Sequence, residues 1–210
     1  SVGVNHFNTG VLASTGAGNV TLTGRTLNAS GLGIASFSAT DRISSNGGLI
    51  TLSANSIGIT GIVNASTSGN VTIQTLGAGV DLGGADSAAN LGLLSSEINQ
   101  IIARVLTINS NSSAIVNTAA INRSNATLGT NLTLISGGAI TQSGGNLTVS
   151  GTSNFVAVGN AITLNNATND LGTLTANGGL ISVIDLNDII LAGVTTTGGL
   201  TVNVNTSTSC

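Results

Sequence analysis

Residues 131–149 read Asn-Leu-Thr-Leu-Ile-Ser-Gly-Gly-Ala-Ile-Thr-Gln-Ser-Gly-Gly-Asn-Leu-Thr-Val. The phrase Asn, aliphatic, Thr, aliphatic occurs twice in this stretch. Its alternation with period two places Leu147 and Val149 on one face of a strand and Thr148 on the other. The Gly-Gly pairs between the phrases indicate tight corners. The stretch therefore predicts short strands, each with one buried face, joined by glycine corners.

The same kind of phrase recurs along the chain, which predicts a repeat architecture. It occurs at residues 19–22, 48–52, 70–73, 131–134, 146–149, 161–164, 180–183 and 199–202. The gaps of roughly 15 to 30 residues fall within the range of repeat proteins. Further strands are predicted at residues 56–60 and 155–158. Positive φ angles are expected at the corners Gly47-Gly48, Gly69-Asn70, Gly137-Gly138, Gly144-Gly145, Gly178-Gly179 and Gly198-Gly199.

The composition favours a stack of strands over other classes. The 210 residues include 30 Gly, only 3 Phe, no Pro, Trp, Tyr or Met, and 5% charged residues. A β-sandwich would place aromatic residues in its core. Disorder is disfavoured because the mean hydropathy is +0.46 and the net charge only -3. Like residues stacked about 4.8 Å apart favour Val, Ile, Leu, Thr and Asn. We therefore predict an all-β fold, a single β-solenoid over residues 1–210.

One stretch departs from the strand pattern and predicts a helical insertion over residues 86–104. Ser95 and Ser96 are N-cap candidates, and Glu97 suits a first helical turn. Three isoleucines then follow at helical spacing, at Ile98, Ile101 and Ile102. We expect a short amphipathic helix near residues 95–104 that packs on one side of the stack; the alternative is a helix that binds a partner.

Charge and hydropathy exclude two classes of partner. The sequence pI is near 4.5, and the four basic residues, Arg25, Arg42, Arg104 and Arg123, are spread along the chain. They offer no footprint for nucleic acid. No apolar run reaches the 18 residues typical of a membrane helix, so no membrane insertion is expected. The sequence lacks an initiator Met, and we expect a mature product or a piece of something longer.

The acidic residues do not predict an enzyme. Asp185 and Asp188 could pair across a turn as in polysaccharide-cleaving enzymes, but no basic or aromatic residues accompany them, so a turn-forming role is predicted. Asp81 and Asp86 are the candidates for calcium, yet the glycine-rich nonapeptide of calcium solenoids is absent. No cofactor is expected, with calcium as the alternative. His6 is the sole histidine, which excludes a His-based metal site or triad within the chain.

Two kinds of covalent attachment remain open. Asn-x-Ser/Thr sequences are candidate glycosylation sites, with Asn19, Asn64, Asn70, Asn131 and Asn146 the main candidates. The alternative for such asparagines is a stacked ladder. Cys210, the one cysteine, is a candidate intermolecular link, or else an idle thiol. Ice binding would need Thr-x-Thr on every coil, which the sequence does not provide.

Part of the chain resembles the repeats of filamentous haemagglutinin-like bacterial surface proteins. The resemblance rests on residues 80–86, 91–93, the predicted helix at 95–104 and residues 105–108, and on the later phrases at 131–140, 145–149 and 166–172. It spans about residues 45–205. The resemblance implies a right-handed parallel β-helix, exported to the bacterial cell surface as part of a long adhesin or filament, and brings no catalytic residues.

These observations lead us to expect a structural or adhesive rod, secreted or held at the bacterial surface, that acts as a stalk or adhesin. Its expected partners are host-cell or surface glycans and proteins, or copies of itself. One alternative is a filament subunit that polymerises end to end through its terminal coils, because unpaired strand edges invite pairing. A polysaccharide-binding or polysaccharide-cleaving β-helix is the remaining alternative.

Overall fold

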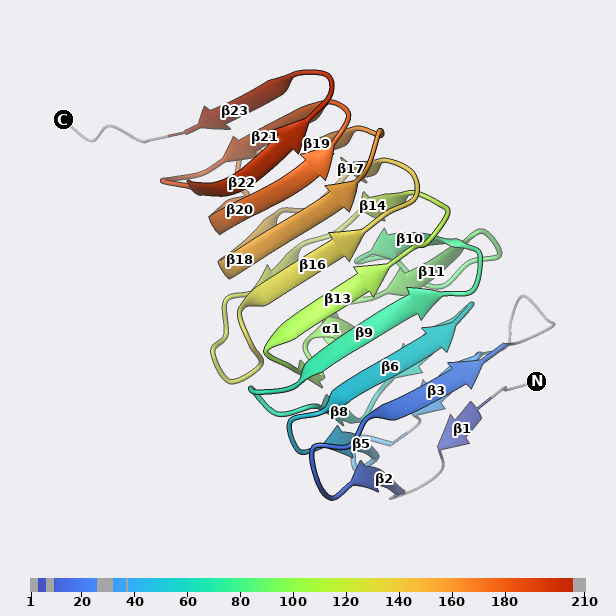
Figure 1. Cartoon of the computed structure of the whole chain (residues 1–210). Helices are drawn as coiled ribbons and strands as arrows, with labels where there is room; N and C mark the ends of the chain where they lie inside the picture. Colours follow the sequence, from blue (N-terminus) through green and yellow to red (C-terminus); the bar gives the residue numbers. More distant parts are fainter. Residues whose placement is uncertain (1–3, 7–9, 26–31, 37, 206–210) are drawn as a thin grey trace.

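The computed structural model describes residues 4–6, 10–25, 32–36 and 38–205. In this part of the chain nearly all regular structure is β-strand, and every pairing of neighbouring strands is parallel (Figure 1). The strands form four sheets, here named A to D. Sheet A contains β1 (Val4–His6), β4 (Ile34–Ser36) and β7 (Ile57–Ile59). Sheet B contains β2 (Val11–Ser14), β5 (Arg42–Ser45), β8 (Ile62–Asn64) and β12 (Ile101–Ile102).

Sheets C and D are the longer pair. Sheet C contains β3 (Val20–Gly24), β6 (Leu49–Ala54), β9 (Asn70–Thr75), β13 (Val105–Asn109), β16 (Asn131–Ile135), β18 (Leu147–Ala157), β20 (Asp170–Gly178) and β22 (Ile190–Thr196), with β15 (Ile121–Arg123) paired to β18. Sheet D contains β10 (Gly79–Leu82), β11 (Asn90–Leu93), β14 (Ile115–Asn117), β17 (Ile140–Gln142), β19 (Ile162–Leu164), β21 (Ile181–Asp185) and β23 (Leu200–Val204). The single helix among the described residues is α1 (Ser95–Ile98).

The chain visits the sheets in a regular order. From β1 to β9 the order A, B, C repeats three times, and from β16 onward strands of sheets C and D alternate. We call one run of the chain through the sheets a passage. Each sheet C strand between β3 and β22 pairs with the sheet C strand of the preceding passage and with that of the following passage, with β15 as an extra partner of β18, whereas β10 and β11 pair with each other within one passage. Figure 1 shows the result for sheet C, whose strands lie side by side in chain order from β3 to β22. The predicted all-β class and the predicted repeats are confirmed.

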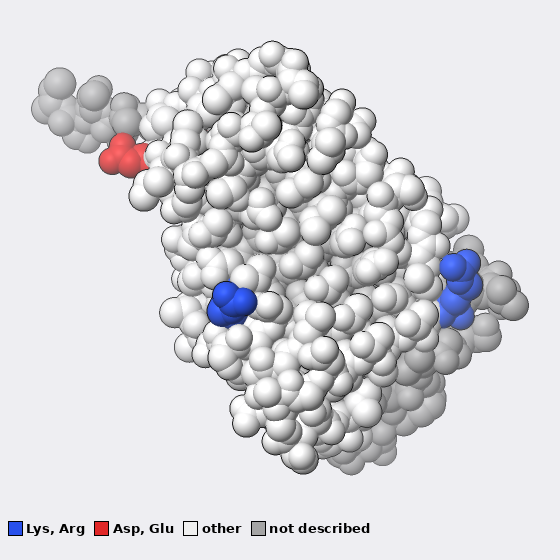
Figure 2. Space-filling model, viewed as in Figure 1, with Lys and Arg blue, Asp and Glu red and all other residues white. Residues whose placement is uncertain are grey.

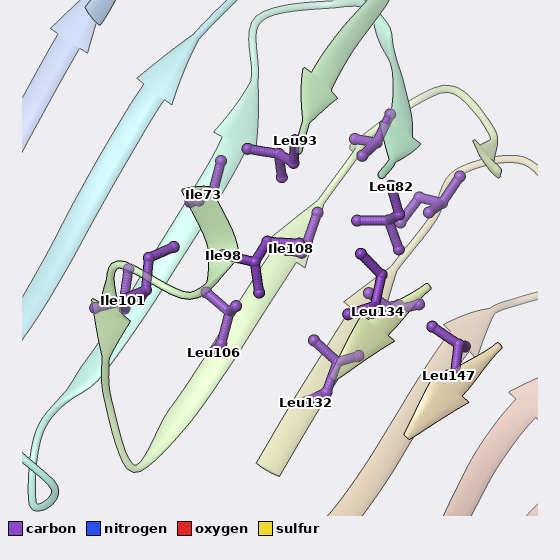
Figure 3. Packing of buried hydrophobic residues seen from close by; sticks show 14 of the residues in the cluster. Ile73, Leu82, Leu93, Ile98, Ile101, Leu106, Ile108, Leu132, Leu134 and Leu147 are labelled. Atoms are coloured by element: carbon purple, nitrogen blue, oxygen red, sulfur yellow. The ribbon is translucent and has the colours of Figure 1, made fainter. Parts of the chain in front are cut away.

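The alternating pattern of the repeats is also confirmed. Leu147 and Val149 are buried, whereas Thr148 between them is partly exposed. Inward-facing side chains stack in register across sheet C in the order Leu52, Ile73, Ile108, Leu134, Phe155 and Ala176. Side chains from sheets C and D meet in one apolar interior, where Leu82 of β10 and Leu93 of β11 lie with Ile108 (Figure 3). Burial of this interior is the main favourable contribution to folding.

Phe155 shows how the interior is filled without a second aromatic ring beside it. Its side chain is fully buried, and its register partners are Leu134 on one side and Ala176 on the other. The small alanine leaves room for the large ring, so the two positions together fill the space that two leucines would occupy elsewhere. The passages also differ in length. The segment from Val71 to its partner Leu106 carries β10, β11, α1 and β12, which explains the uneven spacing of the repeats.

The predicted helix exists but is shorter than expected. α1 ends at Ile98, and its N-cap residue is Leu94, not Ser95 or Ser96. Ile101 and Ile102 form β12, in register with Val63 and Asn64 of β8. The prediction of a helix through residue 104 was wrong because isoleucine suits a strand as well as a helix and the edge of β8 offers its backbone ladder bonds. Figure 3 shows Ile98 directed into the same interior as Ile101 and Leu106.

The corner glycines serve a different purpose from the one expected at most positions. Of the predicted pairs, only Gly47 has a positive φ, at 95°. At Gly144 a Cβ atom would lie 1.9 Å from the Thr118 carbonyl oxygen of the neighbouring passage, and at Gly137 2.2 Å from that of Asn111. The prediction of positive φ at these corners was wrong. Glycine is needed there because successive passages approach so closely that a side chain would collide with the backbone beside it.

Candidate functional surfaces and buried charges

The five asparagines selected as modification candidates lie at different kinds of position, and two of them connect neighbouring passages. The Asn131 amide nitrogen donates to the Arg104 carbonyl at 2.9 Å, and its Oδ1 accepts from the Thr152 amide at 2.8 Å. The exposed Asn19 accepts from the Leu49 amide at 3.0 Å. Both asparagines therefore tie one strand to the next through backbone groups, and Asn131 stacks on Val105, not on another asparagine.

The other candidates bond locally or sit within a strand. Asn64 accepts from the Ser66 amide at 2.7 Å, and Asn146 donates to the Thr148 hydroxyl at 3.1 Å. Asn70 begins the central strand β9, and its Oδ1 is buried without a hydrogen-bond partner. Cys210 lies outside the described residues, as does the side chain of His6.

Two carboxylates join sheet A to sheet D where backbone pairing stops. Asp86 accepts from the Ile57 amide of β7 at 3.0 Å and from the Gly92 amide of β11 at 2.8 Å. Glu97 of α1 accepts from the Ile59 amide at 2.9 Å and from the Leu94 amide at 2.9 Å. Each carboxylate thus uses one oxygen for β7 and the other for β11 or the residue that follows it. We call Asp86 and Glu97 the carboxylate bridge.

Burial sets the titration of this bridge. Desolvation raises the pKa of Asp86 from 3.8 to about 6, against the opposing effect of its two backbone N–H donors, and the negative charge of Glu97 adds to the rise. Desolvation likewise raises the pKa of Glu97, again against two backbone N–H donors. The sequence could not reveal the bridge, because the two β7 amides that it binds lie 29 and 38 residues earlier in the chain than the carboxylates.

The remaining acidic residues have structural surroundings. Asp185 is fully buried and accepts from the Leu171 amide at 2.8 Å and from the Asn187 amide at 3.1 Å, which confirms its turn-forming role. Desolvation raises its pKa, to which the charge of Asp170 also contributes. Asp188 is exposed. Asp81, the other calcium candidate, accepts from the Thr118 hydroxyl, whereas Asp86 is engaged by backbone amides. The described residues contain no group of three or more His, Cys, Asp or Glu arranged to hold a metal ion.

Arg123 is buried, which its sequence neighbours do not indicate. Its side chain is only 1% exposed, and its guanidinium donates to the Ile101 carbonyl at 3.0 Å and to the Leu128 carbonyl at 2.8 Å. Its Nε has no hydrogen-bond partner. Desolvation lowers the pKa of Arg123 to about 10, so the guanidinium keeps its charge at neutral pH. Arg123 thereby ties the segment after β15 to the end of sheet B.

The outer face of sheet C is broad and uncharged. Its central column stacks one polar residue from each of the seven strands from β3 to β20 in register, namely Thr21, Thr51, Thr72, Thr107, Thr133, Asn154 and Thr175. The flanking columns mix polar and aliphatic residues such as Asn109 and Ile135. Figure 2 shows this face almost without Lys, Arg, Asp or Glu. Of the described sheet C strands, only β3 and β20 carry a Thr-x-Thr pair, Thr21 with Thr23 and Thr173 with Thr175, whereas ice binding requires such a pair on every coil.

A shallow hollow lies over sheet B. Its volume is about 360 Å³, and it is open to solvent. Hydroxyl and amide side chains dominate its lining, which consists of Ala13, Ser14, Thr15, Ser44, Ser45, Asn46, Asn64 and Ser66. The hollow can offer hydrogen bonds to a neutral ligand but contains no ionisable group. None of the helices in the described parts of the chain is long and apolar enough to cross a membrane.

Comparison with known proteins identifies repeats in the middle of the chain. A family model described as repeats of unknown function (DUF5649) matches residues 103–177. This stretch begins just after β12 and ends within β20, so it covers β13 to β19 and most of β20, where strands of sheets C and D alternate apart from β15. No curated protein matches the chain, and neither does any solved structure. The match agrees with a repeat protein built from parallel strands.

Proposed function

We propose that the four sheets form a right-handed parallel β-helix and that this segment acts as a structural rod of a secreted bacterial surface protein, as a stalk or adhesin of the filamentous haemagglutinin-like kind. The observation that supports this proposal most is sheet C. Eight of its strands follow one another in chain order, in parallel and almost continuous register, and all but the last cover one apolar interior.

Such a stack suits a rod because each passage adds length and leaves the cross-section unchanged. At about 4.8 Å between strands, the eight strands from β3 to β22 span roughly 35 Å. Every internal strand has hydrogen-bonded neighbours on both edges, so the stack resists extension and local opening along most of its length.

The surface supports a role in contact with neutral partners. The eight sheet C strands from β3 to β22, with β15 set aside, contain one charged residue, Asp170. The outer face of sheet C and the hollow over sheet B instead present hydroxyl and amide groups. These neutral groups form hydrogen bonds with sugars or polar protein surfaces without the need for an ion pair. Salt screens ion pairs, so adhesion through such groups would depend little on the salt concentration.

Small-angle X-ray scattering tests the rod. The expected result is an elongated particle whose cross-section matches a single stack, and a compact spherical particle would refute the proposal.

Adhesion is tested in a separate experiment, in which beads coated with the protein are applied to an array of neutral glycans. Thr107→Lys with Thr133→Lys places two charges at the centre of the outer face of sheet C and is expected to reduce binding at least tenfold, whereas Val158→Lys at another exposed position is not. Absence of any glycan binding by the wild type would remove the adhesive part and leave the stalk.

A second candidate is a filament subunit that joins copies end to end. It is favoured by the exposed apolar side chains of β22 and β23, among them Ile190 at 65%, Leu191 at 47% and Leu200 at 45% exposure. β22 and β23 also lie at the ends of sheets C and D. The backbone N–H and C=O groups along their outer edges pair with no further strand among the described residues. Light scattering over a hundredfold range of concentration distinguishes the two candidates. A particle mass that rises with concentration supports the filament, and a constant monomeric mass refutes it.

A further inference from the structure

Two Asn-x-Ser/Thr sequences lie back to back on one exposed segment. Residues 122–127, here called the sequon loop, read Asn-Arg-Ser-Asn-Ala-Thr and lead from the end of β15 toward β16. All of its residues except Arg123 are exposed. Most of the other described sequons lie within or next to strands that are paired on both edges, and an enzyme cannot draw such strands out of a sheet without breaking the ladder.

Arg123 fixes the sequon loop from beneath. Its buried guanidinium bonds to the Ile101 and Leu128 carbonyls, so the residue between the two asparagines points inward while its neighbours face solvent. The turn behind the loop is closed by Leu128 and Gly129, whose amides both donate to the Asn125 carbonyl at 3.0 Å. The loop is therefore a held, outward-facing turn.

Both asparagines adopt the same local geometry. The Oδ1 of Asn122 accepts from the Ser124 amide at 2.8 Å and from the Ser124 hydroxyl at 2.7 Å. The Oδ1 of Asn125 accepts from the Thr127 amide at 3.0 Å and from the Thr127 hydroxyl at 2.7 Å. Two donors on Oδ1 draw electron density from the carboxamide and make the Nδ2 protons more acidic. In the described structure neither Nδ2 donates a hydrogen bond, so both amide groups are available to a reagent.

Asn166 provides a control within the same chain. Its Oδ1 accepts from the Thr168 amide at 2.9 Å and hydroxyl at 2.7 Å, as in the sequon loop. Its Nδ2, however, donates to the Gly144 carbonyl at 3.1 Å, and the residue is partly buried. The turn is the same, but the nitrogen is occupied by the neighbouring passage.

The sequons selected earlier lack this combination. Asn131 uses both amide atoms between passages. In the sequon of Asn64, the Ser66 hydroxyl pairs with Ser68 at 2.7 Å and not with the asparagine. Asn19 is exposed, but its Oδ1 accepts from the adjacent strand.

We propose that Asn122 and Asn125 are the sites at which the folded protein accepts N-linked sugar. The donor class is a sugar activated as a nucleotide or lipid phosphate ester. The Nδ2 nitrogen attacks the anomeric carbon, a C–N bond forms, the bond from that carbon to the phosphate oxygen breaks, and the phosphate group leaves with the electron pair. Nδ2 loses one proton to the transferase base. A glycan here stands beside the junction of sheet B and β15, away from the close contacts between passages.

The test treats the folded protein with a soluble sequon-specific N-glycosyltransferase and its nucleotide-activated hexose, followed by peptide mapping in a mass spectrometer. Ser124→Ala removes the hydroxyl that serves Asn122 and leaves Asn125 intact, and Thr127→Ala does the reverse, so each variant controls the other. Synthetic peptides of residues 118–130 and 162–172 report how the enzyme treats the two kinds of sequon in the absence of the fold. Circular dichroism verifies that both variants remain folded.

The expected result is hexose on Asn122 and Asn125 of the folded protein, at least tenfold more than on Asn166, although both peptides are modified. Each alanine variant is expected to lose modification at its own asparagine alone. The proposal is overturned if the folded protein stays unmodified at both asparagines while the 118–130 peptide reacts. It is equally overturned if Asn166 or Asn131 in the folded protein is modified as fast as the sequon loop.

Discussion

The carboxylate bridge makes the stability of the protein depend on pH, in a direction that its burial determines. Asp86 has a pKa of about 6 in the folded protein and an ordinary value of 3.8. Because the folded-state pKa is the higher one, the folded state binds the proton more tightly than the unfolded state does. The fold is therefore most favoured below about pH 4 as far as this group is concerned, and that advantage is lost as the pH rises through 6. Glu97 acts in the same direction because its pKa is also raised.

The magnitude follows from the two pKa values of Asp86. Their difference corresponds to a change of about 3 kcal/mol in the free energy of unfolding between a pH well below both values and a pH well above them. Asp86 is only partly buried, so solvent screening reduces the effect to roughly 1–2 kcal/mol. Because more than half of this effect falls below pH 5, we expect the free energy of unfolding to be lower by about 0.5–1 kcal/mol at pH 7.5 than at pH 5. Asp86→Asn removes the titration, and its pH dependence is expected to be correspondingly flatter.

Urea unfolding followed by far-ultraviolet circular dichroism at pH 5, 6 and 7.5 measures this difference. Asp86→Asn also replaces an acceptor with a donor opposite the Ile57 or Gly92 amide, which destabilises the variant by about 1–3 kcal/mol when the lost bond is not offset by removal of the charge. Asp188→Asn makes the same change of charge at an exposed turn and should keep the wild-type pH dependence. The reasoning fails if the wild type is more stable at pH 7.5 than at pH 5, or if Asp86→Asn retains the full wild-type slope.

Two further predictions concern packing. Phe155→Ala truncates the largest fully buried apolar side chain among the described residues and should lower the free energy of unfolding by about 3–5 kcal/mol, whereas Val158→Ala, at a position 67% exposed, should change it by less than about 0.5 kcal/mol in the same urea titration. Gly144→Ala forces a methyl group against the Thr118 carbonyl and should lower the thermal midpoint by several degrees, while Gly16→Ala, with nothing within 4 Å of the added carbon, should leave it unchanged. Equal effects within either pair would contradict the close approach of successive passages.

The pH dependence, the packing and the sequon loop all arise from contacts between passages, which a sequence reveals only in part. The alternation in Leu147, Thr148 and Val149 was sufficient to predict a strand with one buried face, because side chains of a strand point alternately to opposite sides whatever the strand pairs with. Repetition of that phrase, together with the shortage of charged and aromatic residues, predicted an all-β repeat fold. Both features can be read from the sequence without knowing which strands pair.

What remained undetermined was the partner of each strand and the environment of each polar group. Ile101 and Ile102 satisfied helical spacing, and the free edge of β8 made them a strand instead. Asp86 and Glu97 looked like a loop residue and a helix-start residue, and became a bridge only because β7 and β11 end beside each other. Eleven asparagines share the same three-residue signal, and exposure and the hydrogen bonds of each amide separate Asn122 and Asn125 from the others that the structure describes. The sequence by itself determined the strands and the face that each one buries, because those depend on residues two positions apart. The tertiary structure decided the register, the buried charges and the accessible sites, because those depend on residues that are distant in the chain and adjacent only after the passages stack.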